Sequence, residues 1–139
     1  MATVQEALRA VLSADAGVQA VLGNPPRISA NMARQGVAQP YATYAVVAND
    51  HEQHLDGHGQ LAWYVLQFDC WDSTYLDAHA AMEAIRSALQ DATGTYAGVQ
   101  LLHVTAYSGL RDETGSLPDG RESKIHRVSR DYKVWFYEQ

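Results

Sequence analysis

The sequence has a single cysteine, Cys70, among its 139 residues. One thiol excludes a disulfide within the chain and a zinc site built from several cysteines. No stretch approaches the roughly 18 consecutive apolar residues that a membrane-spanning helix needs. Residues 1–6 (MATVQE) lack the basic start and apolar run of a secretory signal peptide. We therefore expect a protein that folds in a reducing cytoplasm and has no membrane partner.

Basic residues are also few. Ten Lys and Arg stand against sixteen Asp and Glu, which gives a net charge of −6 and argues against a basic surface that binds nucleic acid. Residues 1–120 hold five bases and thirteen acids, whereas residues 121–139 hold five bases and three acids. An acidic body with a basic final segment would let copies of the chain pair head-to-tail. A solvated strand with Lys and Arg on its outer face also fits this pattern.

The length and the apolar fraction of 47% are typical of one folded domain. The sequence has no internal repeat, low-complexity tract or composition shift that would mark a domain boundary. We expect residues 1–139 to form a single domain.

Three segments predict helices. The pattern Thr3-Val-Gln-Glu6 matches a capping box, and apolar residues then recur at helical spacing up to Leu12. Asp15 predicts the cap of a second, short helix that Gly23 ends. The longest helix is predicted over residues 74–92, capped by Asp72 or Ser73.

Four segments rich in aromatic and β-branched residues predict strands, at residues 41–48, 60–71, 99–107 and 124–137. Ile28 is expected to start a further short extended piece. The polar, glycine-containing segments 49–59 and 111–123 are predicted to be long loops. Because they have few apolar anchors, we expect these loops to be mobile in an isolated subunit and ordered in an assembly.

This order of elements predicts an α+β fold, in which helices pack on one face of a four-stranded, largely antiparallel sheet. Alternation along the strands places Leu66, Phe68 and their neighbours on the core face. The opposite face is predicted to carry six large or charged side chains: Trp63, Trp71, Arg127, Lys133, Trp135 and Tyr137. Three tryptophans on an outward face indicate that other residues or another subunit cover them, so these six are candidate subunit-interface residues.

Few residues point to chemistry. His51, His54 and His58 have a loosely ligand-like spacing for zinc or nickel. The predicted loop around them lacks a rigid framework, so we expect no metal site and no cofactor. Cys70 lies on an apolar strand face, where a cysteine behaves as a small hydrophobe. The sequence also lacks a nucleophile elbow and a phosphate-binding glycine loop, so we expect no catalytic residues and no enzyme activity.

Taken together, these segments resemble the bacteriophage tail-completion, or tail-terminator, family of long-tailed phages, prophages and gene-transfer particles. The resemblance covers nearly the whole chain, and the order and spacing of its motifs are more specific than any one motif. The matching stretches lie at residues 4–12, 16–22 with 26–28, 39–44, 54–57, 64–69 with 74–78, 84–89 and 132–136.

The resemblance implies a structural virion protein, made in the host cytoplasm and located at the neck between tail and head. It implies a ring, expected to be a hexamer, that ends the tail tube and joins it to a head-completion protein. DNA would pass through this ring without specific binding. The expected partners are thus further copies of the chain, the tail tube protein and the head-completion or connector protein. The candidate docking loops contribute His51, His54, His58, Arg111, Asp112, Glu113 and Arg121.

Two alternatives remain open from the sequence. One is another neck or head–tail connector component with the same fold. The other is a small metal-binding or ligand-binding α+β domain that uses the three loop histidines.

Overall fold

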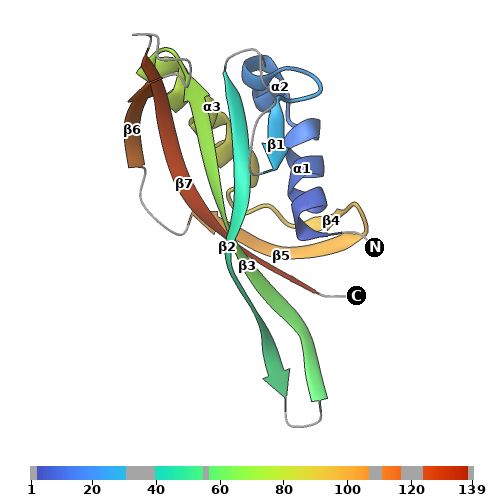
Figure 1. The fold of residues 1–139 in the computed structure, drawn as a ribbon. Helices are drawn as coiled ribbons and strands as arrows, with labels where there is room; N and C mark the ends of the chain where they lie inside the picture. Colours follow the sequence, from blue (N-terminus) through green and yellow to red (C-terminus); the bar gives the residue numbers. More distant parts are fainter. Residues whose placement is uncertain (1–2, 31–39, 55–56, 107–110, 117–123, 138–139) are drawn as a thin grey trace.

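The computed structural model describes residues 3–30, 40–54, 57–106, 111–116 and 124–137. Within the strands, residues 49–54, 57–60, 111–116, 124 and 125 are described by their backbone alone. The described part contains three α-helices, which lie on one face of a curled, mixed sheet (Figure 1).

Local sequence signals explain where each helix begins. Helix α1 (Val4–Ala14) starts after Thr3, whose side-chain oxygen accepts a hydrogen bond from the Glu6 backbone N–H at 3.2 Å. Helix α2 (Ala16–Leu22) starts after Asp15, whose carboxylate accepts from the Val18 N–H at 2.9 Å. These two caps confirm the predicted starts, because each satisfies a backbone donor that the first helical turn leaves free.

Helix α3 (Tyr75–Leu89) differs from its predicted cap. The cap is Thr74, whose hydroxyl accepts from the Asp77 N–H at 3.3 Å. The predicted caps Asp72 and Ser73 instead hydrogen-bond each other, with the Ser73 N–H donating to Asp72 Oδ1 at 2.6 Å. The helix therefore begins one residue later than expected and ends before the predicted limit at residue 92.

The sheet contains seven strands among the described residues. They are β1 (Ile28–Ala30), β2 (Tyr41–His54), β3 (Gly57–Asp72), β4 (Gly94–Tyr96), β5 (Val99–Ala106), β6 (Arg111–Ser116) and β7 (Lys124–Tyr137). Six lie in the order β1-β2-β3-β7-β5-β4, and β6 pairs with β7. Only the β1–β2 pairing is parallel among these described strands.

The prediction of four strands is therefore wrong, although the α+β class and the largely antiparallel pairing are confirmed. The additional strands are β1, β4 and β6, and two are as short as three residues. Of these, β1 begins at Ile28, where a short extended piece was predicted. Strand β6 lies inside the segment 111–123 that was predicted to be a loop. Its sequence, RDETGS, has no apolar side chain to indicate a strand, and it joins the sheet by backbone pairing with β7.

Strands β2 and β3 also extend into the predicted loop 49–59. Their antiparallel register continues to the pairs Gln53 with His58 and His54 with Gly57. Strand β7 stops pairing with β3 at Leu61, so residues 51–54 and 57–60 form a two-stranded arm that projects past the body (Figure 1). We call these residues the arm.

Strand β7 is the centre of the sheet. One edge of β7 pairs with β3 from His126 to Tyr137. The other edge is divided, because residues 124–129 pair with β6 and residues 132–137 pair with β5.

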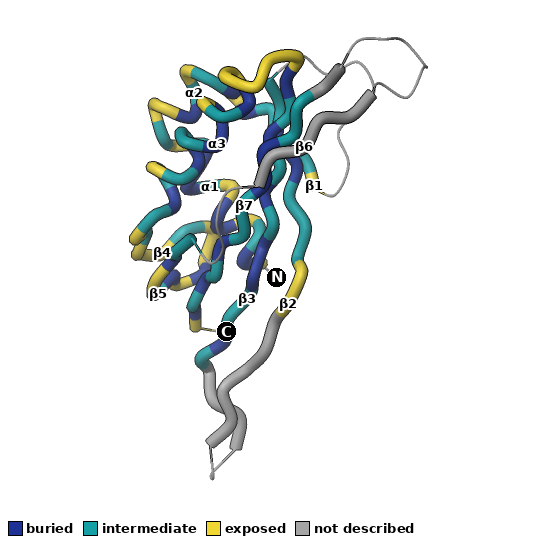
Figure 2. The backbone as a smooth tube through the Cα atoms, turned by 90° about the vertical axis from the view of Figure 1, so that its left-hand side faces the viewer, coloured by how far each residue is buried: buried dark blue, intermediate teal, exposed yellow. Residues whose placement is uncertain are grey.

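The core lies between the helices and one face of the sheet (Figure 2). Helix α1 supplies Leu8 and Leu12, and α3 supplies Met82 and Ile85, all with at most 1% of their surface exposed. The sheet supplies Leu66, Phe68, Tyr132 and other alternate residues, as the sequence predicts. Tyr132 is fully buried, and its hydroxyl donates to Met82 Sδ at 3.5 Å. This bond satisfies a polar group that would otherwise be costly to bury.

Candidate functional site

The face of the sheet opposite the helices is the most distinctive surface that the structure describes, and we call it the outer face. The register pairs Trp63 with Trp135 and Trp71 with Arg127 across β3 and β7. Lys133 and Tyr137 alternate with Trp135 along β7 and therefore share this face. The structure thus confirms that the six predicted residues lie on one face. Their role in a subunit interface stays a prediction.

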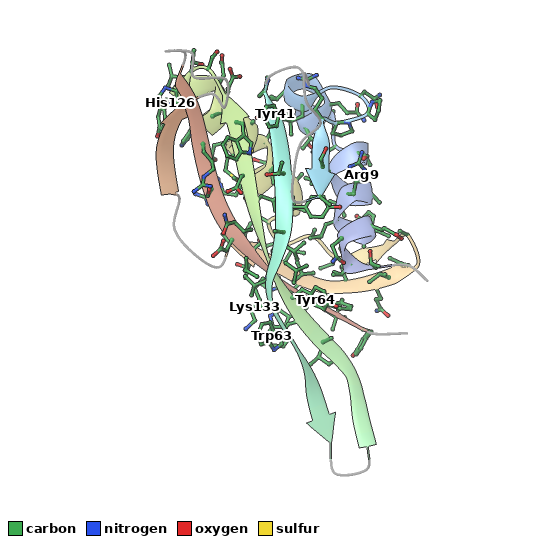
Figure 3. All side chains as sticks on the ribbon, viewed as in Figure 1. Arg9, Tyr41, Trp63, Tyr64, His126 and Lys133 are labelled. Carbon is green, nitrogen blue, oxygen red and sulfur yellow. The ribbon has the colours of Figure 1, made fainter. Side chains whose placement is uncertain are left out.

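A lysine between two tryptophans forms one end of the outer face. The Lys133 ammonium nitrogen lies 4.5 Å from the ring centre of Trp63 and 4.6 Å from that of Trp135. The two ring centres are 6.4 Å apart. Figure 3 shows Lys133 beside Trp63. Both nitrogen-to-ring distances suit a cation–π interaction, in which the negative faces of the indoles attract the ammonium. We call these three residues the Trp–Lys–Trp cluster, and they lie where the arm leaves the body.

A second aromatic group lies further along the same strands. The rings of Tyr41 and Trp71 are stacked at 6.2 Å, and the Arg127 guanidinium carbon lies 5.6 Å from the Trp71 ring centre. The Trp71 indole N–H donates to Thr43 Oγ1 at 3.3 Å. Partial burial raises the pKa of the Tyr41 hydroxyl. The indole is therefore fixed by stacking on one side and by a hydrogen bond at its edge.

A polar group separates the two aromatic groups. The Ser129 hydroxyl donates to the Asp69 carboxylate, and Gln67 donates to the same carboxylate at 3.0 Å. Ser129 is 2% exposed and Thr43 is 5% exposed. The middle of the outer face is therefore already covered within the chain at these two residues.

The three tryptophans are half-buried, and no described helix covers them. The sequence predicted that the tryptophans are covered either by residues of the same chain or by another subunit. Part of the covering within the chain comes from Lys133, Arg127 and Tyr41. The remaining exposed aromatic area, including Tyr137 at 41% exposure, is available for contact with another subunit.

The candidate docking residues fall mostly on strands. His51, His54 and His58 lie on the arm, where the backbone pairs His51 with Ala62 and His58 with Gln53. The prediction that these histidines lack a framework is therefore wrong, because a β-hairpin holds their backbone. Their side chains lie outside the described part, so the prediction of no metal site is untested at this position.

The second candidate docking segment also lies partly on a strand. Arg111, Asp112 and Glu113 belong to β6, and Glu113 pairs with Arg127 in the backbone register. Their side chains, like the whole of Arg121, lie outside the described residues. The expected mobility of these segments remains a prediction.

Other chemistry-bearing residues are structural where they are described. Cys70 is fully buried, and burial with the nearby Asp69 charge raises the pKa of its thiol far above the ordinary value. Among the described side chains, no three His, Cys, Asp or Glu groups gather as a metal site would require. None of the helices in the described part is long and apolar enough to cross a membrane.

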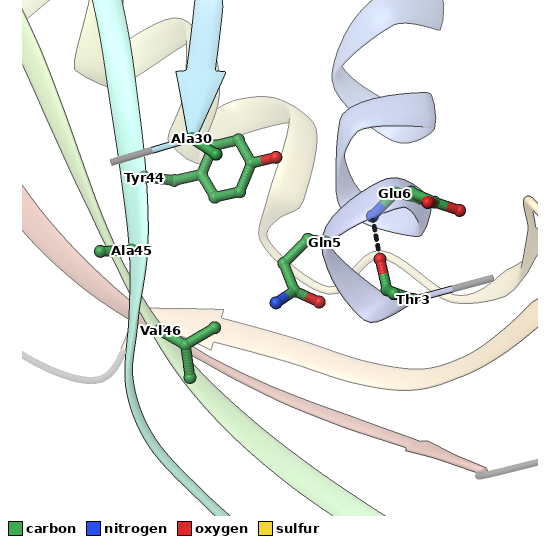
Figure 4. A pocket seen from close by; sticks show the side chains of 7 residues that line it. All are labelled: Thr3, Gln5, Glu6, Ala30, Tyr44, Ala45 and Val46. Atoms are coloured by element: carbon green, nitrogen blue, oxygen red, sulfur yellow. Dashed lines mark hydrogen bonds between the residues drawn. The ribbon is translucent and has the colours of Figure 1, made fainter. Parts of the chain in front are cut away.

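A groove lies at the sheet edge where β1 ends. Its volume is about 390 Å³, and Figure 4 shows its lining side chains between the end of β1, β2 and the start of α1. The lining residues are Thr3, Gln5, Glu6, Ala30, Tyr44, Ala45 and Val46. Sequence reasoning missed this groove, because its lining residues come from three segments that are separate in the sequence. It also missed Tyr41 and Thr43 as outer-face residues, although the alternation that identified Trp71 applies equally to β2.

An α+β domain with a partly covered aromatic and cationic sheet face has the features of an assembly protein. Comparison with known families also indicates an assembly protein and identifies its family. The family described as "Tail completion protein gp17" matches residues 6–137, so the chain belongs to this family. It is a structural protein of a phage-type virion tail, as its resemblance to tail-completion proteins predicted.

A solved structure has a similar fold. One chain of the "Virion of native gene transfer agent (GTA) particle" aligns with a TM-score of 0.66 and 18% sequence identity. The alignment covers 96% of this chain and 94% of that chain. At this identity the likeness shows that the fold is shared. No curated protein matches the chain.

Proposed function

We propose that this protein ends the tail tube as a closed ring, most simply a hexamer, and joins it to a head-completion protein. Family membership supports the place in the tail. The similar chain comes from the virion of a gene transfer agent, which supports a role within a larger particle. The observation that supports self-association is the outer face, with two aromatic groups that no described helix covers.

The outer face has the composition of an interface centre. Trp, Tyr and Arg supply most of the affinity at protein interfaces, because their large side chains exclude water over a wide area. Here Trp63, Trp71 and Trp135 are already fixed by contacts within the subunit. Fixed side chains lose little conformational freedom on association, so less binding free energy is lost.

The charge distribution favours a head-to-tail contact. Residues 50–91 hold eight acids and one base, whereas residues 121–133 hold five bases and two acids. Arg127 and Lys133 bring part of that basic segment to the outer face. Complementary patches at different positions of one chain form a heterologous interface, which closes into a ring when its rotation fits. A net charge of −6 would also keep DNA from adhering to the ring lumen.

The test is assembly on purified tail tubes, followed by light scattering and electron microscopy. Wild-type protein should form a ring on the tube end. Arg127→Glu and Lys133→Glu should each form it more slowly, and the double variant more slowly still, because charges at an interface rim guide association. Arg86→Glu makes the same change of charge as either single reversal, but on α3, and should assemble normally.

To test what the aromatic side chains contribute to ring stability, a variant must leave the subunit folded. Trp135→Ala should weaken the ring more than the charge reversal does, but it also removes contacts within the subunit. Tyr137→Ala removes a ring that is 41% exposed on the outer face, and Tyr75→Ala is the matched control at 39% exposure on α3. Tyr137→Ala should lower ring stability and Tyr75→Ala should not. A two-fold dimer on the tube, or a ring indifferent to all outer-face changes, would refute the proposal.

A further inference from the structure

The sheet has two strand edges that no described strand covers. Strand β1 pairs with β2 only from Ala42 to Tyr44, so no strand of the described part pairs with the outer edge of β2 from Ala45 to His54. Strand β6 pairs with β7 alone among the described strands, which leaves its outer edge open from Arg111 to Ser116. An open edge presents unpaired backbone N–H and C=O groups, to which another strand can add.

The β2 edge has a bulge near the groove. The pairing of β2 with β3 shifts register between Val46 and Ala48, and the intervening Val47 is 51% exposed. A bulge and an exposed apolar side chain at one point restrict which strand and which register fit, because a flat partner would not match the local twist. The groove lies beside the end of β1, where Ala30 of β1 and Ala45 and Val46 of β2 line it (Figure 4).

The two edges lie on opposite sides of the same sheet. The strand order runs from β1 and β2 through β3 to β7 and β6, and Figure 1 shows β6 on the side away from β1. A contact between opposite edges joins different surfaces of two copies and is therefore heterologous, as a ring requires. A contact between two β2 edges would instead be two-fold and would stop at a dimer.

Charge also favours pairing between the different edges. Residues 45–54 of β2 contain two acids, Asp50 and Glu52, and no Lys or Arg. Strand β6 and its β7 partner residues 124–129 contain three bases and two acids. Two β2 edges would place acids against acids, which opposes their association.

From these observations we propose that β6 of one copy adds to the open β2 edge of the next copy, so that the sheets join around the ring. This inference rests on the proposed ring and names the backbone contact that joins its subunits. The outer face and the sheet edges are separate surfaces, so one can be tested while the other is intact.

Cysteine cross-linking on tail tubes tests the strand contact. Val47→Cys is combined with a cysteine placed in turn at each position from 111 to 116 of β6. Side chains that face each other across paired strands are close enough for a disulfide or a short bis-maleimide. The native Cys70 is fully buried and should not react.

The expected result is a ladder of covalent oligomers up to the full ring for at least one double variant. A mixture of the two corresponding single variants should give dimers only, and each single variant alone should give none. Leu76→Cys replaces Val47→Cys in the control, because Leu76 is 77% exposed and lies on helix α3 instead of on a strand edge. This control should give no oligomers with any β6 cysteine.

A second variant tests the edge without covalent chemistry. Val47→Lys places a charge on the open edge and should prevent ring formation while leaving the melting temperature unchanged. Leu76→Lys should affect neither.

Three results would overturn the inference. Dimers of Val47→Cys alone would indicate two-fold edge pairing, and cross-links to the tube protein would identify a different occupant of the edge. Rings of normal size without any cross-link would refute the strand contact and leave the proposed function intact. Monomers on the tube would refute both.

Discussion

Replacing Lys133 with methionine tests the interaction energy of the Trp–Lys–Trp cluster. Methionine keeps most of the apolar length of the lysine side chain and removes the ammonium. The ammonium lies within 4.6 Å of two indole centres. Each cation–π contact is worth about 0.5–1 kcal/mol at an exposed site and about 2 kcal/mol when desolvated. Since one half-buried ammonium is shared by two rings, we expect a loss of about 1–2 kcal/mol in the free energy of unfolding.

Urea unfolding followed by circular dichroism measures this loss without relying on tryptophan fluorescence. A loss of this size corresponds to a decrease in melting temperature of about 3–8 °C for a domain of this length. A double-mutant cycle with Trp63→Leu isolates the Lys133–Trp63 interaction from other contacts that either side chain makes. The coupling energy should be about 0.5–1 kcal/mol.

Arg86→Met is the matched control. It removes a cation that contacts Glu83 at 3.1 Å on the surface of α3, an arrangement worth about 0.2–0.5 kcal/mol. If Lys133→Met costs no more than this control, or if the coupling to Trp63 is zero, the indoles do not stabilise the ammonium and the reasoning fails.

Three further predictions concern a buried thiol, a surface carboxylate and the three histidines of the arm. Cys70 should resist alkylation by iodoacetamide until the protein is unfolded, because burial raises the pKa of its thiol; rapid labelling of the folded protein, detected by mass spectrometry, would contradict this. His103 Nε2 lies 3.0 Å from Asp91 Oδ1, and hydrogen bonding to the carboxylate holds the pKa of Asp91 below its ordinary value. A carboxyl with a lowered pKa stabilises the folded state above its ordinary pKa, so Asp91→Asn should reduce stability at neutral pH and lose this effect as pH falls through the lowered pKa; equal losses at neutral and acidic pH in urea unfolding would contradict this. Chelator should leave the melting temperature unchanged, whereas stoichiometric zinc in purified protein would show that His51, His54 and His58 bind metal.

The parts of the fold that bury a face were predictable from the sequence. The caps at Thr3 and Asp15 mark where α1 and α2 begin, and the apolar spacing of α1 marks its buried side. Strict alternation in β3 and β7 places Leu66 inside and Trp63 outside. These patterns are readable because burial on one side forces the sequence to repeat with the period of the helix or strand.

The arm and β6 were not predictable in this way. Residues 51–54 and the β6 sequence RDETGS pair as strands through their backbones, and neither sequence alternates between apolar and polar residues. A strand without that alternation has the same sequence character as a polar loop. The groove was not predictable either, since its lining residues come from three separate segments and form no motif.

The position of β7 has a consequence for synthesis. It is the last described strand in sequence order, yet it joins β3 to β5 and β6. Until it emerges from the ribosome, the β2–β3 hairpin and the β4–β5 hairpin have no strand between them, and a central part of the core-facing sheet is missing. Chains interrupted before residue 124 therefore cannot complete the sheet and would expose apolar surface to chaperones and proteases.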